Sequence, residues 1–95
     1  MTTERFAIHN RVAQLREHRD VCFRDARDEM RCDMNDPDIR AAFDIADYLM
    51  SRASDRAAHD PAFAQSFIAA LETHYETTLE PLLNARATTV PRFNK

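Results

Sequence analysis

Apolar residues recur every three or four positions along most of the chain, which is the spacing of one face of an α-helix. The clearest example lies between Pro37 and Ala57, where the apolar positions fill an arc of roughly 120° on a helical projection. They are Ile39, Ala42, Phe43, Ala46, Leu49, Met50, Ala53 and Ala57. Asp44 and Asp55 lie on the opposite side. The pattern predicts a helix with a single buried face.

Two Asp-Pro pairs, at residues 36–37 and 60–61, mark the helix boundaries. Aspartate is a good N-cap and proline is favoured at the first helical position, so each pair ends one helix and begins another. We expect an all-α domain over residues 1–95, a compact bundle of three main helices at about 4–33, 37–58 and 61–79. Pro81 lacks an amide donor and should kink or restart the chain, which leaves a short helix at 80–87 and an extended tail at 88–95.

The apolar face predicted for helix 61–79 is wider than that of helix 37–58 and spreads over about half of the circumference. Its members are Phe63, Phe67, Ile68, Ala70, Leu71, His74, Tyr75 and Leu79. Such a helix either packs centrally against two neighbours or offers one side to a partner. We expect the second arrangement, with Ile68, Tyr75 and Leu79 as partner contacts and Tyr48, on the outer face of helix 37–58, as a further one. A homodimer with two-fold symmetry is the simplest form.

Composition excludes several functional classes. The chain has no glycine, so phosphate-binding loops and glycine-containing hairpin turns are disfavoured. The net charge of −3 is small, and basic residues form no stripe, which argues against nucleic-acid binding. The longest apolar run, residues 67–71, is too short to cross a membrane. Cys22 and Cys32 lie about 15 Å apart along one helix and cannot pair with each other, so we expect reduced thiols in the cytoplasm.

Polar residues on the first helix form one stripe that could carry chemistry: His18, Cys22, Asp25, Glu29 and Cys32. His18 and Cys22 are one turn apart and could ligate the same metal ion. A second ligand pair is missing, since neither CxxC nor HExxH occurs. Glu72, Glu76 and Glu80 belong to the polar side of their helix in this projection. We therefore assign no metal ligands and no cofactor, and a metal- or redox-responsive protein using His18 and Cys22 remains an alternative.

Two further residues are polar although they occupy positions on the predicted apolar faces. His74 lies on an apolar face, and Arg19 projects into the apolar arc of the first helix, where it needs a carboxylate partner or a route to solvent. A small-molecule enzyme built around them is a third hypothesis, which lacks a paired acid or base. We expect a non-enzymatic protein-interaction module of bacterial or phage type: an adaptor, regulator, chaperone-like factor or inhibitor. Its partner is a protein or itself, not a nucleic acid or a membrane.

Overall fold

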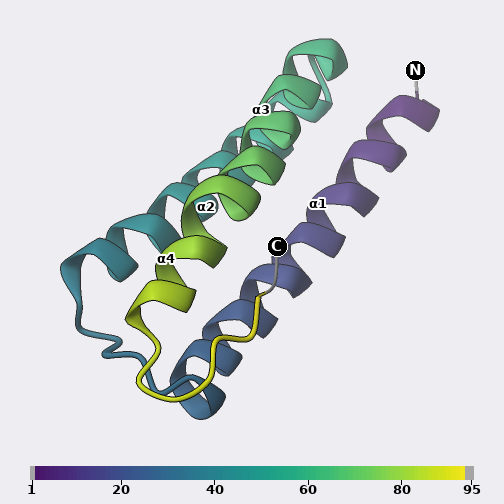
Figure 1. The fold of residues 1–95 in the computed structure, drawn as a ribbon. Coiled ribbons are helices and arrows are strands. Elements are labelled where there is room, and N and C mark those ends of the chain that lie inside the picture. Colours follow the sequence, from purple (N-terminus) through teal and green to yellow (C-terminus); the bar gives the residue numbers. More distant parts are fainter. Residues whose placement is uncertain (1, 94–95) are drawn as a thin grey trace.

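The computed structural model describes residues 2–93, and side chains from Arg5 onward. Helix α1 (Thr2–Arg24) continues into a π-helical turn, η1 (Asp25–Glu29), and a loop leads to α2 (Pro37–Ala57). Helix α3 (Pro61–His74) continues through a second π-helical turn, η2 (Tyr75–Leu79), into α4 (Glu80–Arg86). Figure 1 shows α2 and α3 as an antiparallel hairpin with α1 alongside it. The described residues contain no strand, so the predicted all-α bundle is confirmed.

Both Asp-Pro pairs act as predicted. The Asp36 carboxylate accepts a hydrogen bond from the Asp38 amide at 2.9 Å, and Asp60 accepts one from the Phe63 amide at 3.1 Å. Each aspartate therefore satisfies an amide that the helix itself leaves without a partner. The start of α2 and the start of α3 coincide with the predicted residues.

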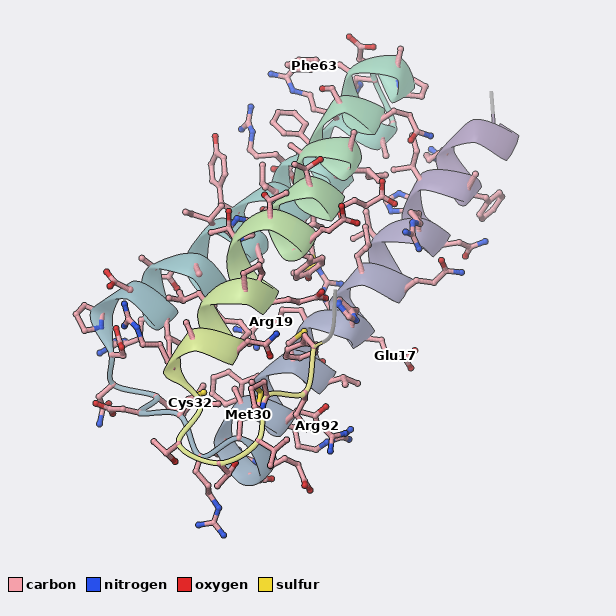
Figure 2. The ribbon with its side chains drawn as sticks, viewed as in Figure 1. Glu17, Arg19, Met30, Cys32, Phe63 and Arg92 are labelled. Carbon is pink, nitrogen blue, oxygen red and sulfur yellow. The ribbon has the colours of Figure 1, made fainter. Side chains whose placement is uncertain are left out.

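The helical segment that begins with α1 ends at Glu29, the last residue of η1, earlier than the predicted residue 33, and the C-terminal tail binds this end. The Thr88 amide donates to the Met30 carbonyl at 3.0 Å, and the hydroxyls of Thr88 and Thr89 donate to the carbonyls of Arg31 and Glu29. Arg31 adopts a left-handed φ of 57°, which turns the chain out of the helix. The crossing of the tail over this end is visible in Figure 1, and Figure 2 shows Met30, Cys32 and Arg92 gathered there. Residues 94–95 of the predicted tail lie outside the described part.

The predicted short helix at 80–87 is confirmed as α4, with Pro81 in its first turn, but no break precedes it, since the chain remains helical from Pro61 to Arg86. Instead, η2 precedes the proline, and the Glu80 amide donates to the Tyr75 carbonyl five residues back. The core positions of this segment, Leu71, Tyr75, Leu79 and Leu83, are spaced by four. A regular α-helix would turn such positions away from the core by about 40° per step, and one wider turn compensates for the drift.

The core lies where three helical segments meet: α1 with η1, α2, and the continuous segment of α3, η2 and α4. Helix α2 contributes mainly small side chains to it: Ala42, Ala46, Ala53 and Ala57 are buried, together with Ile39, Phe43 and Met50. Small residues allow helix axes to approach closely. None of the helices in the described part of the chain is both long enough and apolar enough to cross a membrane.

A pH-dependent clamp joins α4 to the start of α2. The Arg86 guanidinium contacts Asp36 and donates to Asp38 Oδ2 at 2.9 Å, and its hydrogen bond holds the pKa of Asp36 below the ordinary value. We expect Asp36→Asn, which keeps the N-cap, to lower the free energy of unfolding at neutral pH. A depressed carboxyl pKa contributes stability that is present above about pH 4 and is lost as the pH falls through the folded-state pKa.

Urea unfolding from pH 7 to pH 2 should therefore show the free energies of unfolding of the native chain and of Asp36→Asn becoming equal in acid. Asp44→Asn, on an exposed position of α2, is the control. A difference that is independent of pH would contradict the clamp.

Candidate functional site

Three side chains with metal-ligand chemistry converge between α1 and the start of α4. His18 Nε2 lies 2.7 Å from Glu80 Oε2 and 3.6 Å from Cys22 Sγ. One ligand atom from each residue lies within 4.8 Å of the other two. His18 and Glu80 are separated by 62 positions in the sequence, so the fold, and not the local chain, brings them together. We call these three residues the HCE cluster.

The position of Glu80 corrects the sequence analysis, which placed it on the polar side of its helix. Only 9% of Glu80 is exposed. The π-helical turn η2 inserts one residue just before it, which rotates the following residues by about 100°. Glu80 therefore moves from the outer side to the edge of the contact with α1. The four-residue spacing of Leu71, Tyr75 and Leu79 was the available sign of this turn.

The thiols are protected rather than reactive. Cys22 is fully buried, and burial, followed by the negative charges of Glu80 and Asp25, raises its pKa to about 12. Burial likewise raises the pKa of Cys32, whose thiol donates to the Leu83 carbonyl at 3.5 Å. Both cysteines are free. Redox-active thiols have a depressed pKa and access to solvent, so these environments disfavour redox sensing.

Two residues of the HCE cluster, His18 and Glu80, line a pocket of about 330 Å³. The lining residues are Arg11, Gln14, Leu15, His18, Glu72, Tyr75, Glu76 and Glu80. Arg11 closes one side by donating to Glu72 at 2.9 Å and to Gln14 at 3.0 Å. The Tyr75 ring packs edge-on against the His18 ring at 4.9 Å, and its hydroxyl donates to the Leu15 carbonyl at 2.8 Å. These contacts hold the His18 ring in place.

The four predicted partner contacts occupy two different environments. Ile68, Tyr75 and Leu79 are 4%, 4% and 0% exposed and belong to the core, because α3 packs against both α1 and α2. Tyr48 is 60% exposed on α2. Binding of a partner by the first three stays a prediction, and it would require these side chains to leave the core.

Structural contacts account for the two residues that suggested an enzyme. The Arg19 guanidinium forms two hydrogen bonds to Asp47, at 3.0 and 3.1 Å, and packs over the rings of Phe23 and Phe43. His74 is buried, and its Nε2 lies 2.8 Å from the Ala42 carbonyl oxygen. The expected carboxylate partner of Arg19 is therefore Asp47, and His74 links α3 to α2.

The exposed apolar side chains that accompany Tyr48 on α2 and α3 were not predicted as partner contacts. Ile45 and Phe63 are both nearly half exposed. Arg52 packs over Phe67 and Arg56 over Phe63, with ring-to-guanidinium distances of 5.8 and 5.4 Å. We call Ile45, Tyr48, Arg52, Arg56, Phe63 and Phe67 the α2–α3 surface. One sign was present in the sequence: residues 61–71 contain no charged side chain.

Comparison of the chain with protein-family models, with curated proteins and with solved structures finds no match in any of the three.

Proposed function

We propose that the protein is a non-enzymatic helical module that binds another protein through the α2–α3 surface, and that a second copy of the chain is the simplest partner. The observation that carries this proposal is the exposure of Ile45, Tyr48 and Phe63 at 47%, 60% and 45% on two adjacent helices. Phe63 and Phe67 pack against each other and against Arg56 and Arg52, which follow Tyr48 along α2, and exposed apolar groups gathered in this way mark interaction sites.

The composition of the α2–α3 surface supports this role. Ile45, Tyr48, Arg52 and Arg56 follow one another at helical spacing along a single side of α2. Tyrosine, phenylalanine and arginine are enriched at protein interfaces, and tyrosine and arginine often dominate the binding energy. Arg52 and Arg56 are already held against aromatic rings, so binding would cost them less conformational freedom.

The adjoining helix lacks charges that would oppose a partner. The exposed residues on the first three turns of α3 are uncharged: Ala62, Phe63, Gln65, Ser66, Ala69 and Ala70. Charged residues are depleted from the centres of interfaces because they lose hydration there. Elsewhere the surface is rich in charge, as 31% of the chain is Asp, Glu, Lys or Arg.

Molar mass measured by light scattering over a concentration series tests the proposal. The native chain of 11.0 kDa should approach twice that mass as concentration rises, and Tyr48→Glu should remain at the monomer mass with an unchanged circular dichroism spectrum. Phe6→Glu is the matched control, because Phe6 is an equally exposed aromatic residue on α1. A native protein that stays monomeric throughout would refute self-association. Loss of the dimer in Phe6→Glu but not in Tyr48→Glu would place the interface on α1.

A further inference from the structure

We propose that the HCE cluster is a binding site for a divalent transition-metal ion of the zinc type. His18 Nε2, Cys22 Sγ and a carboxylate oxygen of Glu80 would be the protein ligands, and a fourth position would open to the pocket. This site is separate from the α2–α3 surface and does not depend on the proposed function.

The separations suit tetrahedral coordination. Zinc lies about 2.0–2.1 Å from a histidine nitrogen and about 2.3 Å from a thiolate, which places the two atoms about 3.6 Å apart at a tetrahedral angle. The distance between His18 Nε2 and Cys22 Sγ is 3.6 Å. Nitrogen and carboxylate oxygen need about 3.3 Å by the same reasoning. His18 Nε2 and Glu80 Oε2 lie 2.7 Å apart in a hydrogen bond, so a small rotation of the Glu80 side chain would admit the ion.

The donor set selects the kind of ion. One nitrogen, one sulfur and one oxygen suit Zn²⁺ or Co²⁺, whereas Mg²⁺ and Ca²⁺ take oxygen ligands alone. On binding, the Cys22 thiol loses its proton to solvent and His18 presents an unprotonated Nε2. The thiolate and the Glu80 carboxylate together then balance the two positive charges of the ion. A neutral assembly suits this place, because Cys22 is fully buried and Glu80 nearly so.

The surroundings provide both support and access. Cys22 is fully buried, and His18 and Glu80 line the pocket of about 330 Å³, so the fourth position would face the pocket on the side of these two residues. Three protein ligands and one exchangeable ligand, such as water, define an open zinc site. Tyr75 packs edge-on against the His18 ring and restricts its orientation, as residues around a metal ligand commonly do.

Bound metal would tie α1 to α4, whose contributions to the HCE cluster are 62 positions apart. A ligand that binds only the folded chain stabilises it, and one that links two distant segments opposes their separation. We therefore expect Zn²⁺ to raise the thermal unfolding midpoint of the native chain, and not to raise that of variants lacking a cluster ligand.

The test uses the full chain free of tag histidines, titrated with Co²⁺ alone and then with Zn²⁺ in competition. We expect one ion per chain and a thiolate-to-cobalt charge-transfer absorption, which Zn²⁺ removes. Cys22→Ser should abolish that absorption, and Glu80→Gln and His18→Gln should each weaken binding at least tenfold. His18 is half exposed, so His18→Gln should fold even if the Cys22 variant does not.

Matched controls separate this site from other donors. Cys32→Ser removes the other buried thiol and His59→Gln an exposed imidazole, and both should bind as the native chain does. Absence of thiolate-to-cobalt absorption in the folded native chain would overturn the proposal. So would an absorption that disappears in Cys32→Ser, or affinity that is unchanged in His18→Gln.

Discussion

Leu79→Glu should unfold the protein rather than merely prevent association. Leu79 has no exposed surface and lies in η2, where the core receives side chains from the three helical segments. A carboxylate there would lose its hydration without a cationic partner, and the leucine side chain would leave the core. Truncation of a buried leucine alone costs about 2–5 kcal/mol, and buried charge adds to that. Domains of this size are stable by roughly 5–15 kcal/mol, so the loss is a large fraction of the total.

Circular dichroism and urea unfolding would measure the effect. We expect Leu79→Glu to lose most of its helical signal at 25 °C, or to retain it only with a much lower urea midpoint. Tyr48→Glu, at an exposed position of α2, should keep the signal, and its midpoint should equal that of the native chain at concentrations where the native chain is monomeric. If Leu79→Glu stayed as helical and as stable as the native chain while losing a partner, the face of α3 would be open in solution and the packing described above would be wrong.

Ala46→Leu is the second substitution with a large expected effect. Ala46 is fully buried on α2, among the small residues that let this helix approach its neighbours. The isobutyl group has no space there, so either the helices separate or side chains leave their preferred rotamers. Overpacking of this kind typically costs about 1–3 kcal/mol. In a domain of this length it should lower the thermal midpoint by roughly 4–8 °C for each kcal/mol.

Ala41→Leu provides the matched comparison on the same helix, since Ala41 is exposed. Its stability should stay within about 0.5 kcal/mol of the native value. Equal effects of the two substitutions in thermal unfolding would mean that α2 does not bury the face carrying Ala46.

The helix starts and faces were predictable because their causes are local. An aspartate followed by proline supplies both the capping oxygen and the fixed backbone angle within two residues. The apolar face of α2 follows from a constant rotation of 100° per residue, and all but one of its assigned positions are buried, Leu49 being half-buried. The wide face of α3 was compatible with a helix that packs against two neighbours, which the fold supplies as α1 and α2, whereas we expected one side of it to face a partner.

The remaining features depend on contacts between distant segments. The chain after η1 is bound by Thr88 and Thr89, nearly sixty residues later, and no local pattern around Met30 reveals these contacts. The pairing of His18 with Cys22 was visible from spacing alone. The position of Glu80 next to them was not visible from spacing. A helical projection assumes a constant rotation of 100° per residue, and this assumption fails at η2, so the projection puts the residues after η2 on the wrong face. Two of the three residues of the HCE cluster could therefore be paired from the sequence, and the third, Glu80, could be assigned only from the fold.

The tail that crosses the end of α1 has a consequence for the order of events during synthesis. Helices α2 and α3 are joined by a loop of three residues. Because their contacts are local in sequence, this helical hairpin can form early. The Thr88 hydroxyl and the Arg31 carbonyl are 57 positions apart. The hydrogen bonds from the tail to the carbonyls that follow α1 and η1 therefore cannot form until residue 88 has left the ribosome. Until then, the carbonyls of Glu29, Met30 and Arg31 depend on water. The first helix to be made is in this sense the last to be completed.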